Sequence, residues 1–246
     1  MNIKYYNTYE DDFVQSKNQN YKLRKNYKWI KNNILYKIIS FLIYIPFLIY
    51  SFIYTKLILK ITFKNKKILK NYKNYFLYAN HTQEMGDAFN PAIGLFPNKP
   101  YIIVSSSNLG IPIIGKLLPM LGALPIPNEI HQMKKFIECV NTRSKTNPII
   151  IYPEAHVWPY CTFIRDFKET SFEFPVINNI PTFTMTTTYQ KGKKKPKITI
   201  YFDGPFFPDE LETKKQKIKN LKTKIYNNMV KNSKNSTYNY IIYKKN

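Results

Sequence analysis

The chain has 246 residues and a mass of 29.3 kDa, a length that suits one domain with an appendage. Its 38 Lys and Arg against 15 Asp and Glu give a formal net charge of +23, which favours an anionic partner and says nothing about the fold. The two cysteines, Cys139 and Cys161, form no CxxC motif, so two reduced thiols are expected and a disulfide framework is not.

The first two segments differ sharply in polarity. Residues 1–33 form a basic polar segment, and no cleavable signal peptide is expected because the apolar run starts too late. Residues 34–63 are apolar, and the 18 residues from 38 to 55 carry no charge, which is the minimal length of a membrane-spanning helix. Pro46 lies in the middle and predicts a kink or a break in that helix.

Basic residues flank the apolar segment on both sides. The flanking cations are Lys22, Arg24, Lys25, Lys28 and Lys31 before it, and Lys64, Lys66, Lys67 and Lys70 after it. A single span would carry one cluster across the membrane, which the positive-inside rule disfavours. We therefore expect a kinked in-plane segment or a shallow helical hairpin on the cytoplasmic face, with both clusters near anionic headgroups. A buried pair of core helices is the alternative. It is disfavoured because a core helix of a globular protein is rarely apolar around its whole circumference over this length.

Residues 70–231 alternate short strands with helices, and a Lys- and Asn-rich tail, 232–246, follows. The expected strands are 75–79, 101–105, 148–152, 180–189 and 197–204. The expected helices are 128–143, capped by Asn128, and 208–230, which begins with a capping box of Asp209 and Glu212. This order predicts an α/β fold with a mostly parallel central sheet flanked by helices, preceded by a membrane-associated helical segment.

The stretch "YANHTQEMGDAFNP", residues 78–91, holds the first candidate catalytic residues. His81 comes two residues after the expected end of a strand, and Asp87 lies at the expected start of a short helix. Active groups gather at the carboxyl ends of parallel strands. A His and an Asp placed in this way can form a hydrogen-bonded pair, in which the carboxylate fixes the imidazole tautomer of a general base. Glu84 is a second possible partner for His81.

Two further stretches carry polar or turn-forming residues. In "IIIYPEAHVWPYCTFIRDFK", residues 149–168, Glu154 and His156 follow a strand that Pro153 ends, and Arg165 and Lys168 come later. We expect this carboxylate and these cations at the same sheet edge as His81, although a solvated basic loop would also explain the two cations. The Gly- and Pro-rich residues 108–128 predict tight turns around an apolar surface, and no nucleotide-binding glycine motif is present.

Three ordered stretches resemble the glycerophospholipid acyltransferase superfamily, whose best-known members are bacterial lysophosphatidic acid acyltransferases. That family carries Asn-His with an Asp after four intervening residues, then an "IPxxGxxxxxxGxxFIxR" segment, a "PEGT" segment, an "FK" and a Pro-Val strand. "NHTQEMGD", "IPIIGKLLPMLGALPIPN" and "YPEAHVWP" look like the first three, and "DFKETS" and "FPVINNIP" look like the last two. The match covers roughly residues 75–205. The chain resembles a divergent branch, because five residues separate His81 from Asp87 and Asn128 replaces the family's phosphate-binding Arg.

The resemblance implies an O-acyltransferase without a metal or other cofactor. His81 would act as general base, oriented by Asp87, on a hydroxyl of a lysophospholipid such as 1-acylglycerol-3-phosphate. The acyl donor would be a thioester of coenzyme A or of acyl carrier protein. The implied substrate-binding candidates are Glu154, His156, Arg165, Lys168 and Asn128. The other expected partner is an anionic membrane surface, and nucleic acid is not expected.

Two other readings remain. A metal hydrolase could use the His, Asp and Glu residues of the two polar stretches, but the H-E-x-x-H pattern is absent. A non-enzymatic protein that binds a membrane surface or nucleic acid would fit the charge and the 21 Tyr and 17 Phe. Its basic residues are spread along the chain without a recognised binding motif, which favours the enzyme.

Overall fold

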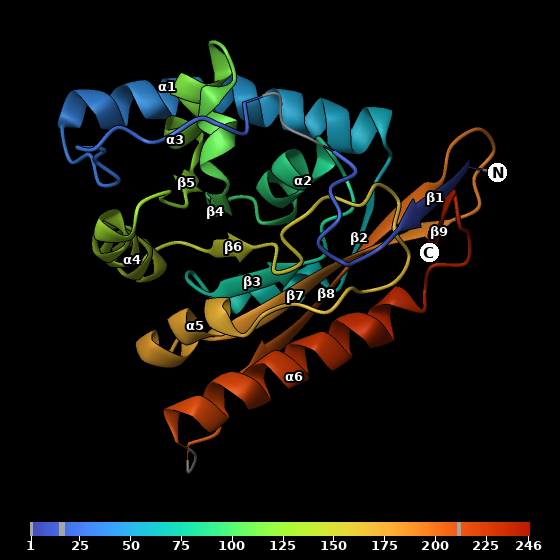
Figure 1. Ribbon diagram of the computed structural model, residues 1–246. Coiled ribbons are helices and arrows are strands. Elements are labelled where there is room, and N and C mark those ends of the chain that lie inside the picture. The colour runs from blue at the N-terminus through green and yellow to red at the C-terminus, as the bar shows by residue number, and fades with distance from the viewer. Residues whose placement is uncertain (1, 15–17, 211–212) are drawn as a thin grey trace.

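A seven-stranded sheet forms the centre of the computed structural model, which describes residues 2–14, 18–210 and 213–246 (Figure 1). The strand order is β2–β8–β7–β3–β6–β4–β5. The strands are β2 (Thr62–Lys64), β3 (Phe76–Ala79), β4 (Tyr101–Val104), β5 (Ala123–Pro125), β6 (Ile149–Ile151), β7 (Thr182–Gln190) and β8 (Lys197–Phe206). Every neighbouring pair is parallel except β7 with β8. The expected α/β class with a mostly parallel sheet is therefore confirmed.

The side chains of the central strand β3 point alternately to the two faces of the sheet and contribute to a hydrophobic core on each face. Phe76 and Tyr78 pack in one cluster with residues of the helices α4 (Ile130–Ser144) and α6 (Lys214–Ser233). Leu77 and Ala79 pack in the other cluster. Successive side chains of a strand point to opposite faces, so a strand buried on both faces is apolar throughout. This pattern places β3 at the middle of the fold and its carboxyl end beside the candidate catalytic loop.

Residues 34–58 of the apolar N-terminal segment form one continuous helical stretch along the outer face of the molecule (Figure 1), whereas Thr62 and Phe63 belong to β2. Helix α1 runs from Ile34 to Phe52 through Pro46, and a π-helical turn, Ile53–Ile58, extends it. The prediction of a helical hairpin is wrong, because a turn inside an apolar segment would expose more backbone groups than the one hydrogen bond that proline removes. The 25-residue stretch is long and apolar enough to cross a membrane. Only 11% of its most apolar 18 residues are buried inside the protein.

Several helix boundaries differ from the sequence prediction. Helix α4 begins at Ile130 without a side-chain cap, because the Asn128 side chain accepts a hydrogen bond from Leu23 N–H instead. Helix α6 begins after a capping box of Thr213 and Gln216, while Asp209 pairs with Lys224, and Glu212 lies outside the described residues. The segment expected to be a Pro-Val strand is the helix α5 (Glu173–Asn178). A proline in the first turn of a helix costs no hydrogen bond, which explains this outcome.

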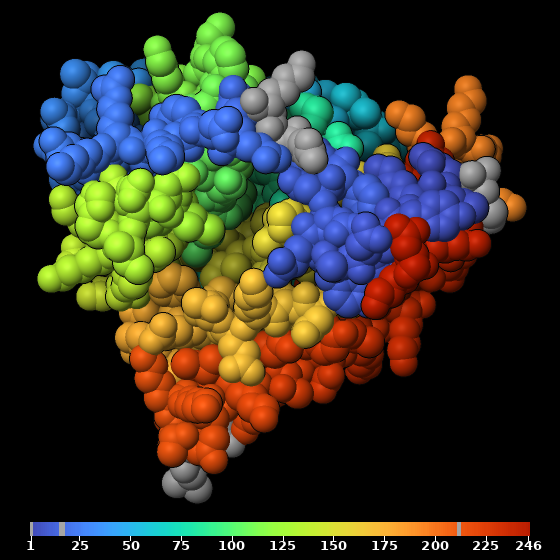
Figure 2. Space-filling view, in the orientation of Figure 1, coloured from blue at the N-terminus to red at the C-terminus, as the bar shows by residue number. Residues whose placement is uncertain are grey.

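The two ends of the chain meet in a second, two-stranded parallel sheet of β1 (Asn2–Tyr6) and β9 (Ile241–Lys245). Between β1 and α1, the N-terminal segment lies across one face of the domain (Figure 2). Leu23 and Trp29 of this segment are buried, and Trp29 Nε1 donates a hydrogen bond to Pro125 O at 2.9 Å. The basic N-terminal segment is therefore packed on the α/β domain.

Candidate active site

His81 and Asp87 form a hydrogen-bonded pair at the carboxyl end of β3. His81 Nδ1 lies 2.7 Å from Asp87 Oδ2, and the side chains are 20% and 4% exposed. Asp87 lies in the first turn of the helix α2 (Gly86–Gly94), and its Oδ2 also accepts the Gln83 N–H at 3.0 Å. The pairing uses Nδ1, so the other ring nitrogen, Nε2, is the one that can take a proton from a substrate.

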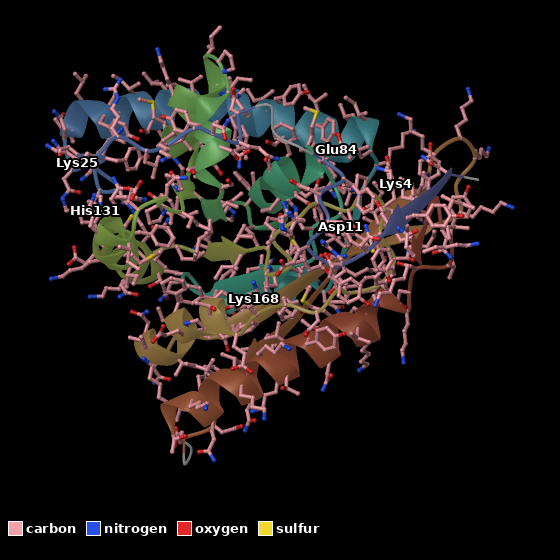
Figure 3. All side chains as sticks on the ribbon, viewed as in Figure 1. Lys4, Asp11, Lys25, Glu84, His131 and Lys168 are labelled. Atoms are coloured by element: carbon pink, nitrogen blue, oxygen red, sulfur yellow. The ribbon has the colours of Figure 1, made fainter. Side chains whose placement is uncertain are left out.

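The five-residue gap between the two residues is accommodated by the turn that starts α2. The Gln83 side chain in this turn accepts a hydrogen bond from Asn90 Nδ2 at 2.6 Å. Asp87 N–H donates to Gln83 O, so the backbone closes a helical turn immediately before the carboxylate. Glu84 is exposed and lies on the side of the molecule nearer the second half of α1, so Asp87 is the partner of His81 (Figure 3).

A buried ion pair fixes the backbone of the His81 loop. Glu154 follows β6, and its carboxylate accepts the His81 N–H at 2.9 Å. The same carboxylate accepts the Arg165 N–H and Arg165 Nη2, each at 2.9 Å, and the two side chains are no more than 1% exposed. The backbone N–H of Trp158 also donates to His81 O at 3.0 Å. Glu154 and Arg165 therefore hold the loop in place from inside the fold.

Tyr152 supports both members of the pair. Its ring stacks on the imidazole of His81 with centroids 4.5 Å apart, and its hydroxyl donates to Asp87 O at 2.6 Å. Burial, and then the Asp87 carboxylate, raises the pKa of Tyr152 well above its ordinary value. The hydroxyl consequently stays protonated and remains a hydrogen-bond donor at every pH at which the protein would work.

The other expected substrate-binding residues have partners within the chain. His156 Nδ1 lies 3.3 Å from Asp12 Oδ1, and Lys168 pairs with Glu10 at 3.0 Å on the surface. Both acidic partners belong to the N-terminal segment, which covers the stretch after Glu154; Asp11 and Lys168 mark this region in Figure 3. Asn128 is engaged with the backbone of Leu23. The structure thus places His81, Asp87, Glu154 and Arg165 together, whereas His156 and Lys168 pair with acidic residues of the N-terminal segment.

Alternative chemistries find less support among the described residues. No group of three or more His, Cys, Asp and Glu side chains in this part of the chain is arranged to hold a metal ion. Both cysteines are buried and free. Burial raises the pKa of the Cys161 thiol to about 12, so it is not a thiolate nucleophile near neutral pH.

Sequence reasoning missed Tyr152 and Trp158. Tyr152 ends the run "PIIIY", where a polar tip after three buried isoleucines is a signal of a residue at the sheet edge. Trp158 is fully buried and is the centre of an aromatic cluster. The rings around it are Tyr6, Tyr9, Phe13, Phe163 and Tyr243, and the Arg165 guanidinium lies 4.7 Å from its centroid. Tyr6, Tyr9, Phe13 and Tyr243 lie far from Trp158 in the sequence, so no local sequence pattern predicts these contacts.

Comparison with solved structures shows that the fold is shared with a known enzyme. The crystal structure of the 1-acyl-sn-glycerophosphate (LPA) acyltransferase PlsC from Thermotoga maritima superposes with a TM-score of 0.52. The two sequences are 15% identical over an alignment that covers 80% of this chain and 94% of that one. No protein-family model matches the sequence, and no curated protein sequence matches it. This likeness establishes a common fold.

Proposed function

We propose that the protein is an O-acyltransferase that transfers a fatty acyl group from a thioester to a hydroxyl of a lysophospholipid such as 1-acylglycerol-3-phosphate. The observation that carries the proposal is the His81–Asp87 pair, 2.7 Å apart, at the carboxyl end of a central parallel strand. The ordered motifs between residues 75 and 205 and the fold shared with an LPA acyltransferase support the same reaction. The donor is acyl-CoA or acylated acyl carrier protein, and no other cofactor is needed.

His81 is the general base of the reaction. The hydroxyl oxygen of the acceptor attacks the carbonyl carbon of the thioester, and His81 Nε2 takes the hydroxyl proton. The C–S bond then breaks, and the leaving thiolate recovers the proton from the imidazolium. Asp87 holds the ring by Nδ1 and stabilises the imidazolium that forms, while Tyr152 and Glu154 keep the ring and the loop in place.

The exposed apolar helix would bring the enzyme to its lipid acceptor. Ile38, Phe41, Leu42, Ile45 and Ile49 of α1 are at least 42% exposed to solvent. Several large apolar side chains exposed together on one helix mark a membrane or protein interaction site. We place the protein at a membrane with its catalytic domain on the cytoplasmic face, beside anionic headgroups that match the net charge of +23.

Mass-spectrometric detection of the acylated product tests the reaction and names its substrates. Purified full-length protein is incubated with palmitoyl-CoA or palmitoylated acyl carrier protein and a panel of lysophospholipids that includes 1-acylglycerol-3-phosphate. We expect a diacyl product from at least one donor and acceptor pair. The absence of product with every pair, from protein that remains folded, would refute the proposed activity.

A further inference from the structure

A cavity lies at the opposite end of the sheet from His81. It is open to solvent on one side and has a volume of about 230 Å³. Its lining comes from the first half of α1, residues 27–31, the start of β4, the end of α4 and residues 119–124. Tyr101 in its wall begins β4, whereas His81 follows the end of β3, and both strands run parallel to β6. No residue of the His81 loop lines this cavity, so it is separate from the candidate active site.

The wall of the cavity carries cations without an acidic partner. Lys31, Lys37, Lys99 and Arg143 line it, and no Asp or Glu does so. Among the described residues, no ion pair that the structure forms includes any of these four. Four unpaired cations around one cavity create a positive potential that favours an anion.

Lys99 and Arg143 lie deepest in this arrangement and repel each other. Lys99 Nζ donates to Met120 O at 2.7 Å and lies 4.5 Å from the ring centroid of Tyr44. The Arg143 guanidinium lies over the Tyr101 ring, and its Nε is buried without a hydrogen-bond partner. Burial first, and then the charge of Arg143, lowers the pKa of Lys99 to about 8. A bound anion would relieve this repulsion.

We propose that this cavity binds the phosphate group of an anionic phospholipid of the membrane. The cations supply charge-assisted donors for phosphate oxygens. Tyr36 and Tyr44 of α1 line the same cavity, and tyrosine rings are typical of the level of lipid headgroups. The outward side of this half of α1 is exposed and apolar, so acyl chains of the bound lipid would lie along it. This proposal does not depend on the acyl-transfer reaction.

Binding to short-chain lipids in a neutral detergent tests the proposal with the full-length protein. The probes are dihexanoyl phosphatidylglycerol, dihexanoyl phosphatidylcholine and inorganic phosphate, measured by titration calorimetry. We expect phosphatidylglycerol to bind and phosphatidylcholine to bind at least about tenfold more weakly, since the four cations of the cavity repel the choline cation of phosphatidylcholine. His81→Ala should bind with unchanged affinity, which separates this site from the active site.

Matched variants locate the binding. Arg143→Gln should weaken phosphatidylglycerol binding about tenfold or more, whereas Lys145→Gln removes the same charge from an exposed residue outside the cavity and should leave it unchanged. If Arg143→Gln does not fold, Lys31→Gln with Lys37→Gln is compared with Lys25→Gln with Lys28→Gln. If a cavity variant binds phosphatidylglycerol as tightly as its exposed control variant, the proposal is overturned. Equal affinity of the wild-type protein for phosphatidylglycerol and phosphatidylcholine also overturns it. Binding of inorganic phosphate without phosphatidylglycerol overturns the lipid as the source of the phosphate.

Discussion

Glu154→Gln should destabilise the fold strongly, because it leaves the buried charge of Arg165 without its counter-ion. The two side chains are no more than 1% exposed, and the carboxylate accepts three hydrogen bonds of 2.9 Å from Arg165 and His81. Removal of one partner from a buried ion pair costs roughly 3–5 kcal/mol of unfolding free energy. The glutamine keeps the shape and one acceptor oxygen, but its amide NH₂ replaces an oxygen that accepts from an N–H, so the loss combines the missing charge with a donor facing a donor.

Denaturant unfolding followed by tryptophan fluorescence measures this loss, because Trp158 is buried beside Arg165. Glu10→Gln is the matched control. It breaks the Lys168–Glu10 pair, whose side chains are 84% and 71% exposed, and it should cost less than about 1 kcal/mol. A loss for Glu154→Gln as small as that of the control would refute the structural role of the buried pair and would leave Glu154 free to bind substrate.

Three other experiments test separate parts of the account. Asp87→Asn should lower kcat/KM for acyl transfer at least about 100-fold, since it removes the carboxylate that stabilises the imidazolium, whereas Glu84→Gln should change it less than about twofold; the reverse ranking would reassign the pair. Ala155→Gly should stabilise the protein by up to about 1 kcal/mol in denaturant unfolding, because Ala155 has a φ of 62°; a loss of stability would contradict that reasoning. Leu42→Glu with Ile49→Glu should release the protein from sedimenting phospholipid vesicles with its thermal unfolding unchanged, since the two side chains are 59% and 57% exposed; retention on the vesicles would place the membrane contact elsewhere.

The pairing of His81 with Asp87 could be predicted from the sequence because both residues are fixed by local structure. The apolar run 75–79 indicates a buried strand, and the carboxyl end of such a strand is where an α/β fold collects its active groups. The mostly parallel sheet could be predicted for the same reason, since the alternation of strands and helices is a local pattern.

Several contacts around the candidate site could not be predicted, because they join distant parts of the chain. The acidic residues of the N-terminal segment reach His156 and Lys168, and β1 pairs with β9 across the whole length of the sequence. Arg165 looks like a solvated cation in the sequence, and only its burial against Glu154 reveals its role. Ala155 stands where the similar "PEGT" segment has glycine. Its backbone is left-handed, a conformation that no propensity scale would assign to alanine.

The most direct test of the central claim is the rate of thiol release from acyl-CoA, or from acylated acyl carrier protein, in the presence of a lysophospholipid. The wild-type protein is compared with His81→Ala, and near-ultraviolet circular dichroism checks that both are folded. A general base is worth roughly 10²–10⁴-fold, so the variant should lose at least about 99% of the acceptor-dependent rate. An acceptor-dependent rate that is unchanged in folded His81→Ala would contradict His81 as the base and, with it, the proposed mechanism.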